Sequence, residues 1–188
     1  MNKKNIQLQI KKLNVILGKI DSNENKNFLL LCKKSLNAVK KGKKIIFFGN
    51  GGSAADSQHL ATELTVKFKK RRVAIAAIAL TNDTSAITAI GNDFEFIKIF
   101  SRQIEALGNS GDICIALTTS GNSQNLIEAI KVAKKKRLIT FCFSGNNGGR
   151  IKKYVKYPII IPSKDTSLIQ VVEVFLGQIF CGFIENNI

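Results

Sequence analysis

The sequence predicts an α/β fold: a three-layer sandwich built on a parallel sheet of about five strands. From residue 43 onward, short apolar segments alternate with segments of helical periodicity, which is typical of a parallel sheet with helical connections. Two of the strand-to-helix connections, 49–53 and 117–123, are rich in glycine and hydroxyl side chains. Turns of this kind lie at the carboxyl ends of parallel strands, where open α/β sheets bind their ligands.

Two helices are expected before the sheet begins. Five apolar residues recur at helical spacing in the first helix: Ile6, Ile10, Leu13, Leu17 and Ile20. A second apolar stripe runs from Phe28 to Val39, and Gly42 follows it as a candidate helix C-cap. We expect an N-terminal helical hairpin over residues 1–42 and an α/β core over 43–188, together forming one domain over 1–188.

The α/β core is expected to alternate strands and helices. The expected strands are 44–48, 73–80, 112–117, 138–143 and 157–161. The expected helices are 53–66, segments within 84–107, 123–135, a short one near 148–154, and 166–184. The stretch Val73–Leu80 is apolar throughout, as expected of a strand whose two faces are both covered.

The last helix is apolar on nearly every side, which predicts that it is buried all round. Gln170, Glu173 and Gln178 interrupt it, so we expect no membrane span. A subunit interface, shared with the first helix, is the favoured explanation.

Charge and cysteine content indicate the compartment and the kind of ligand. The chain has 29 Lys+Arg against 13 Asp+Glu, a formal net charge of +16. The basic residues are scattered, so we expect no nucleic-acid partner, only a broad positive field that attracts anionic substrates. Cys32, Cys114, Cys142 and Cys181 lie in apolar runs without C-x-x-C pairing, and the N-terminus lacks the apolar segment of a signal peptide. We therefore expect buried thiols in a cytoplasmic protein.

The two glycine-rich turns are candidate phosphate sites. The first is Gly49-Asn50-Gly51-Gly52-Ser53, and the second is Thr118-Thr119-Ser120-Gly121-Asn122-Ser123. Each opens a helix whose free N–H groups can bind a phosphate. Neither matches the P-loop or the dinucleotide fingerprint, which favours a phosphosugar over a nucleotide. The alternative is that both are ordinary tight turns with helix-capping Ser and Asn side chains.

Other polar residues stand at spacings that suit chemistry. His59 and Glu63 are four residues apart and share one helix face, which suits a metal pair, a base beside an orienting group, or a solvated face. Asn92 and Asp93 follow Gly91 and either bind hydroxyls or close a turn. Gln170 and Gln178 lie about two turns apart on an apolar helix, where they need hydrogen-bonding partners that a ligand pocket could supply.

Five blocks in collinear order, covering nearly the whole chain, resemble the phosphoheptose isomerases, whose sugar isomerase (SIS) fold is flavodoxin-like. They are G-N-G-G-S-A-A-D-S-Q-H-L-A-T-E-L at 49–64, A-I-G-N-D-F at 89–94, F-S-R-Q-I-E-A-L-G at 100–108, T-T-S-G-N-S at 118–123 and D-T-S-L-I-Q at 165–170. The resemblance implies a homotetramer with active sites between subunits. It also implies conversion of sedoheptulose 7-phosphate into D-glycero-D-manno-heptose 7-phosphate for the heptose of lipopolysaccharide and other surface polysaccharides.

The resemblance also implies roles for individual residues. Glu63 matches the catalytic base, and zinc is implied at the positions of His59, Glu63, Gln170 and Gln178. The substrate-binding positions implied by the matching blocks are Asn50, Gly51, Gly52, Ser53, Glu63, Asn92, Asp93, Thr118, Thr119, Ser120, Ser123 and Gln170. Within this set, Asn92 and Asp93 match positions that contact hydroxyls, and the residues of 118–123 match the phosphate site.

Gln178 is where the chain departs from the family pattern. The family has a histidine eight residues after the C-terminal glutamine, and His59 is the only histidine in this chain. A glutamine amide donates a hydrogen bond but does not exchange a proton near neutral pH. Loss of a positioned acid–base group costs ~10²–10⁴ in rate, and a weak amide ligand also weakens zinc binding.

Three functions therefore remain open on the sequence. The first is an isomerase with a modified acid–base arrangement at Glu63 and Gln178. The second is a catalytically silent relative, a phosphosugar-binding or replication-initiator-associating tetramer. The retained Glu63 favours the enzyme, and the missing histidine favours the silent relative. A third is isomerisation of a different ketose phosphate, because pocket depth sets the length of the sugar.

Overall fold

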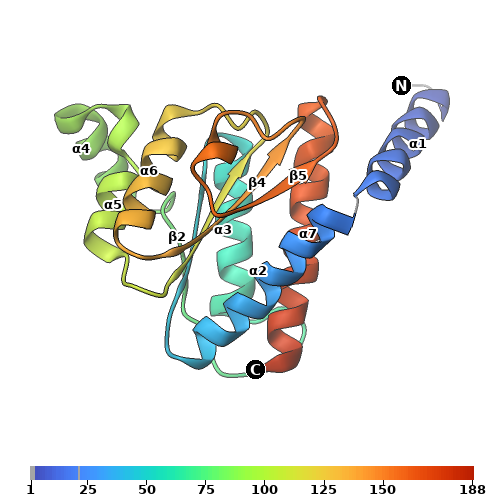
Figure 1. The fold of residues 1–188 in the computed structure, drawn as a ribbon. Helices are drawn as coiled ribbons and strands as arrows, with labels where there is room; N and C mark the ends of the chain where they lie inside the picture. Colours follow the sequence, from blue (N-terminus) through green and yellow to red (C-terminus); the bar gives the residue numbers. More distant parts are fainter. Residues whose placement is uncertain (1–2, 21) are drawn as a thin grey trace.

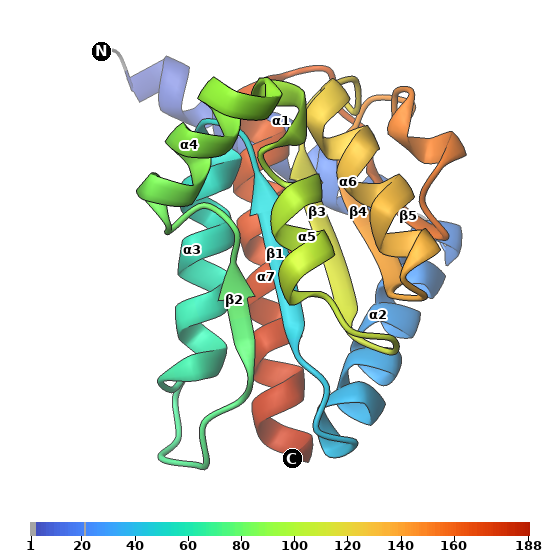
Figure 2. The ribbon, with the colours of Figure 1, turned by 90° about the vertical axis from the view of Figure 1, so that its left-hand side faces the viewer.

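In the computed structural model, which describes residues 3–20 and 22–188, a five-stranded parallel sheet lies between two layers of helices (Figures 1 and 2). The strands are β1 (Ile45–Gly49), β2 (Ala77–Ala79), β3 (Ile113–Thr118), β4 (Ile139–Gly145) and β5 (Tyr157–Ile161), in the spatial order β2-β1-β3-β4-β5. Every neighbouring pair is parallel. The predicted three-layer sandwich is confirmed.

Helices cover both faces of the sheet. One face carries the helices α2 (Ser22–Lys40), α3 (Gly52–Thr65) and α7 (Thr166–Asn187). The other face carries α4 (Thr84–Phe94), η1 (Phe96–Lys98), α5 (Ser101–Leu107) and α6 (Gln124–Lys135). A further short helix, η2 (Ile151–Lys153), precedes β5 in the chain. Figure 2 looks onto the α5 and α6 face. Alternate residues of β1 enter different cores: Phe47 packs with the α3 and α7 side chains, and Phe48 with those of α5 and α6. Strands buried on both faces are apolar throughout, which explains the sequence pattern.

The second strand is much shorter than predicted. Residues 73–80 were expected to form it, but only Ala77–Ala79 do, at an edge where β2 pairs with β1 alone. The residues just before β2 are hydrogen-bonded to the last turn of α3, because the N–H of Ile75 donates to the carbonyl of Leu64. Val73 is 84% exposed, so its apolar character does not mark a covered strand here.

Within one chain, helix α7 is not buried on every side; the sequence analysis expects a subunit interface to cover the part that stays open. Val171, Phe175 and Ile179, spaced four residues apart, are 49%, 48% and 44% exposed and form one open apolar stripe. By length and composition, α7 is the one helix of the described residues that could cross a membrane, and half of its apolar window is buried inside the fold. A core helix of a soluble protein has the same properties.

Helix α1 (Lys3–Lys19) extends beyond the body of the fold (Figure 1). The predicted pair of helices is present, but α1 does not lie back along α2 as a hairpin. Ile6 and Ile10 of its predicted apolar stripe are exposed, while Ile16 is buried. Gly42, expected as a cap, follows α2 with a φ of +69°.

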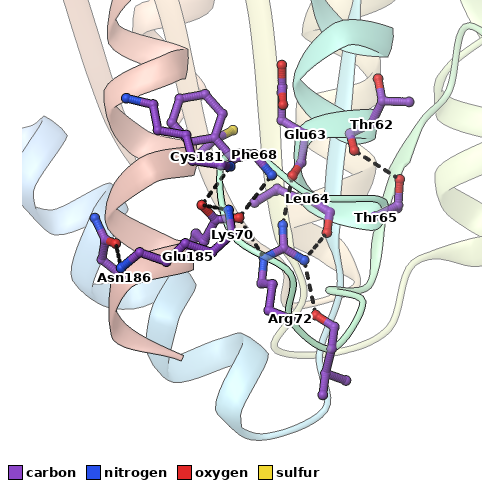
Figure 3. A network of polar contacts seen from close by, with 12 residues as sticks. Thr62, Glu63, Leu64, Thr65, Phe68, Lys70, Arg72, Cys181, Glu185 and Asn186 are labelled. Carbon is purple, nitrogen blue, oxygen red and sulfur yellow. Dashed lines mark hydrogen bonds and ion pairs between the residues drawn. The ribbon is translucent and has the colours of Figure 1, made fainter.

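A buried carboxylate near the end of α7 binds the backbone of the loop that follows α3 (Figure 3). Glu185 accepts hydrogen bonds from the backbone N–H groups of Phe68, Lys69 and Lys70, at 2.9, 2.8 and 3.0 Å. The oxygen that accepts from Phe68, Oε1, also lies 3.3 Å from Nε of Arg72, an ion pair with both side chains buried. Burial alone would raise the pKa of Glu185, but these N–H donors and Arg72 outweigh it and lower the pKa.

Arg72 extends this network back to α3. Its guanidinium donates to the backbone carbonyls of Glu63 and Leu64, at 2.7 and 2.8 Å (Figure 3). These carbonyls lie in the last turn of α3, where helix carbonyls lack intrahelical partners. The network therefore joins the end of α3 to the end of α7.

We predict that Glu185→Gln lowers the unfolding temperature at neutral pH. The folded-state pKa of Glu185 is depressed, so its contribution is present above the unfolded value near 4.5 and is lost as pH falls through the folded value. The difference from wild type should therefore shrink in acid. Glu105→Gln, which removes an exposed partner of Arg102, serves as the control and should change little. Equal effects of the two substitutions at neutral pH would contradict the structural role of Glu185.

Candidate functional site

A pocket opens at the carboxyl ends of β1 and β3. The register of these strands places Gly49 opposite Leu117, so the two glycine-rich turns begin side by side. The pocket has a volume of about 240 Å³ and is lined by Asn50, Gly52, Ser53, Leu117, Thr118, Thr119, Ser120, Ser123, Thr166 and Gln170. Most of the residues expected to bind substrate lie here, contributed by three separate segments of the chain.

The first turn needs its glycines for close packing. A Cβ at Gly49 would lie 2.7 Å from Cβ of Ser53 and 2.8 Å from the carbonyl oxygen of Leu117. A Cβ at Gly52 would overlap the amide of Gln170 on α7. These approaches bring the N-terminus of α3 and one face of α7 against the pocket. Gly51 is exposed and does not line the pocket.

The second turn is shaped by its own hydroxyls. Thr118 Oγ1 accepts a hydrogen bond from the N–H of Gly121, and Ser120 Oγ accepts one from the N–H of Asn122, both at 3.2 Å. Ser123 precedes α6 but makes no side-chain cap hydrogen bond. Its hydroxyl is therefore not an ordinary helix cap, and the N–H groups at the very start of α6, ahead of Leu126, remain for a ligand.

Asn50 is held in one orientation by a residue that the sequence analysis did not single out. The side-chain amides of Asn50 and Asn125 bond reciprocally, at 3.0 and 2.8 Å. Asn125 is buried at the start of α6 and also accepts from the N–H of Leu126. Thr166, another pocket residue that was not predicted, follows the α7 N-cap Asp165.

A second group of polar residues lies further along α3 and α7. Glu63 Oε1 lies 3.0 Å from His59 Nε2, and Gln178 Nε2 lies 3.0 Å from the same ring nitrogen. The two helices approach closely here, since a Cβ at Gly177 would lie 2.6 Å from the side chain of Leu60.

The shared ring nitrogen limits what this group can do at one time. His59 Nε2 either carries a proton and donates to Glu63, or carries a lone pair and accepts from the amide of Gln178. Rotation of the Gln178 amide by half a turn would present its oxygen to a protonated ring instead. The group is thus a carboxylate and an amide on either side of one imidazole nitrogen, which hydrogen-bonds to one of them in each protonation state, and it is open to solvent.

The pocket and this second group are apart within one chain. His59, Glu63 and Gln178 do not line the pocket. Ser53 and Glu63 are ten residues apart on α3, which corresponds to about 15 Å along the helix axis. The structure therefore separates the predicted phosphate site from the predicted base.

Asn92 and Asp93 were expected either to bind hydroxyls or to close a turn, and the turn is wrong. They lie inside α4, which begins after its N-cap Asp83 and runs to Phe94. Both are exposed, their side chains bond to each other at 2.8 Å, and neither lines the pocket. The helical spacing of Ile87 and Ile90, which pack on the core, explains why Gly91 does not end the helix.

Comparison with known proteins gives the family of this chain. Residues 10–145 match the SIS domain family. The chain is 48% identical over 151 residues to a phosphoheptose isomerase of Aquifex aeolicus, covering 80% of this chain and 79% of that protein. It is 45% identical over 188 residues to a phosphoheptose isomerase of Sulfurimonas denitrificans, covering 99% and 96%.

A solved structure agrees with the sequence relatives. The phosphoheptose isomerase of Neisseria gonorrhoeae superposes with a TM-score of 0.91 at 34% identity, covering 98% of each chain. The match to the family, the sequence identities and the superposition lead to one conclusion: the chain belongs to the phosphoheptose isomerase family of SIS-domain proteins.

Proposed function

We propose that the protein isomerises sedoheptulose 7-phosphate to D-glycero-D-manno-heptose 7-phosphate, in the cytoplasm, for surface-polysaccharide heptose synthesis. The observation that carries the proposal is the pocket between the two turns, in a chain that keeps a carboxylate at Glu63. Four buried, free cysteines are consistent with a reducing compartment.

The pocket supplies what a phosphate dianion needs. Ser120, Ser123 and Thr119 offer hydroxyls, and the starts of α3 and α6 offer backbone N–H groups. Helix N-termini favour negative charge, and hydrogen bonds to charged oxygens are the stronger ones. Gln170 and Asn50 line the same pocket and are placed to contact the sugar hydroxyls next to the phosphate.

Proton transfer is assigned to Glu63. A carboxylate there takes the proton from C1 of the ketose and returns it to C2 of the enediol, which gives the aldose. The O1 and O2 protons must move as well, and the amide of Gln178 can hold one of these oxygens without exchanging a proton. We assign that exchange to solvent water, and it is the step that the family histidine would otherwise assist.

A complete site requires two subunits. Eight bonds of about 1.5 Å join C1 of the ketose to phosphorus, so even laid end to end they reach about 12 Å. This is less than the roughly 15 Å between Ser53 and Glu63 along α3. A sugar phosphate bound in the pocket of one subunit would meet Glu63 of another. The open stripe Val171, Phe175 and Ile179 lies on the helix that carries Gln178, and burying it would bring subunits together there. We propose a homotetramer.

Zinc, which the family resemblance implies, is poorly matched by the donor set. Among the described residues, no three His, Cys, Asp or Glu side chains come together as a metal-binding group. His59 and Glu63 are the only usual zinc ligands of the four implied positions, and amides such as those of Gln170 and Gln178 are weak ones. We expect weak zinc binding, and no step of the mechanism depends on it.

We predict that Glu63→Gln abolishes exchange of the C1 proton of sedoheptulose 7-phosphate with deuterated solvent, followed by NMR, while calorimetry shows binding within a few-fold of wild type. Gln178→His should raise turnover, by up to ~10²–10⁴, and tighten zinc binding, because an imidazole is both titratable and a good ligand. If wild type and Gln178→His both neither isomerise nor exchange, the enzyme proposal fails in favour of a phosphosugar-binding tetramer.

The phosphate site is tested by Ser120→Ala combined with Ser123→Ala. Removing two hydroxyls should weaken binding of the sugar phosphate roughly tenfold or more, with an unchanged circular dichroism spectrum. Ser85→Ala, an exposed serine on α4, is the matched control and should bind as wild type. Unchanged affinity of the double variant would place the phosphate elsewhere.

The assembly is tested by light scattering. We expect a mass of four times the 20.7 kDa chain at micromolar concentration. Phe175→Glu places a charge in the open stripe of α7 and should lower the mass, whereas Val73→Glu, at a more exposed position outside the stripe, should not. A wild-type monomer would rule the tetramer out.

A further inference from the structure

One buried carboxyl interacts with both glycine-rich turns. Glu173 lies on α7, one turn after Gln170, and its side chain is completely buried. Its Oε2 is 3.5 Å from Oγ of Ser53, the long limit of a hydrogen bond, and the backbone N–H of Thr118 also interacts with the carboxyl. Ser53 belongs to the first turn and Thr118 to the second, so Glu173 contacts a group from each.

The surroundings of Glu173 disfavour an ionised carboxylate at this position. Burial and then the neighbouring carboxyl of Asp56 raise the pKa of Glu173, the Thr118 N–H and the Ser53 hydroxyl lower it, and the net value is about 8. Oε1 of Glu173 and Oδ2 of Asp56 are buried without a hydrogen-bond partner among the described residues. At neutral pH the side chain is therefore mostly a neutral carboxylic acid.

Packing alone does not require a carboxyl at this position. The buried residues beside it on α7, Val172 and Leu176, are apolar and fill the core. A buried polar group with an unpartnered oxygen destabilises the fold, and a leucine would avoid this. The contacts of Glu173 point instead to the turns that line the pocket.

We infer that Glu173 is a positioning residue for phosphate binding, which holds the Ser53 and Thr118 turns in register from beneath the pocket. The inference rests on the proposed sugar-phosphate function. Ser53 and Thr118 both line the pocket, so a shift of either turn moves the hydroxyls and N–H groups that receive the phosphate.

A pH dependence follows from this position. When Glu173 ionises above neutral pH, its negative charge repels a phosphate dianion bound in the neighbouring pocket, and this repulsion weakens phosphate binding. The titratable groups that face it are the carboxyl of Asp56 on α3 and the thiol of Cys142 on β4, whose pKa is raised by burial and then by Glu173. Neither of these groups offsets the new charge.

The test compares Glu173→Leu and Glu173→Gln with wild type by calorimetry, using inorganic phosphate and sedoheptulose 7-phosphate. At about pH 7, Glu173→Leu should bind each probe roughly tenfold more weakly, while Glu173→Gln, which keeps an acceptor oxygen and cannot ionise, should bind as wild type. At about pH 9, wild type should weaken several-fold and Glu173→Gln should not. Glu105→Gln, an exposed carboxyl, is the control and should follow wild type at both values.

Hydrogen exchange measured by mass spectrometry tests the same inference without a ligand. Glu173→Leu should speed exchange in peptides covering both turns, 49–55 and 117–123, with no change over β5, and Glu173→Gln should restore slow exchange. If Glu173→Leu folds and leaves both exchange and phosphate affinity unchanged, the positioning role is overturned. If wild type binds neither probe but the exchange pattern holds, the proposed function fails and the link between the turns stands.

Discussion

The parallel pairing of β1 and β3 is the constraint on which the rest of this structure depends. It sets Gly49 beside Leu117, and each strand then ends in a turn that opens a helix. Parallel strands end at the same edge of the sheet, so the turns that follow Gly49 and Leu117 meet there although they are nearly seventy residues apart in sequence. The phosphate pocket is a direct consequence of this register. A slip of one residue would turn the side chains of either strand to the other face.

Helix α7 then determines what surrounds that pocket. It crosses α3 so closely that Gly177 has no room for a side chain beside Leu60. Along its length it supplies Gln170 to the pocket, Glu173 beneath it, and Glu185 to the loop after α3. One helix thus supports the substrate site at its start and anchors the helix bearing the candidate base at its end. Its outer stripe stays exposed in the single chain and is the surface of the subunit contact that we propose.

The replacement of the family histidine by Gln178 changes chemistry more than shape. The amide lies 3.0 Å from Nε2 of His59, the same nitrogen that faces Glu63. An amide can hold position beside the imidazole, but it is not an acid or base near neutral pH. In the function that we propose, Glu63 supplies the carboxylate and Gln178 supplies a hydrogen-bond donor where the family pattern has a histidine. The same amide is a weak zinc ligand.

The sequence by itself determined the sheet, the order of the elements and the two turns, because apolar runs and glycine positions are local signals of strands and strand-to-helix turns. It could not determine that Val73 is exposed, that Asn92 and Asp93 are helical, or that one stripe of α7 stays open, because these depend on which elements cover them. Only the tertiary structure brought Asn125 to Asn50, and Glu173 to Ser53 and Thr118. A single polar residue in an apolar helix gives no local sign of its partners, since those partners come from distant segments that meet only when the sheet is assembled.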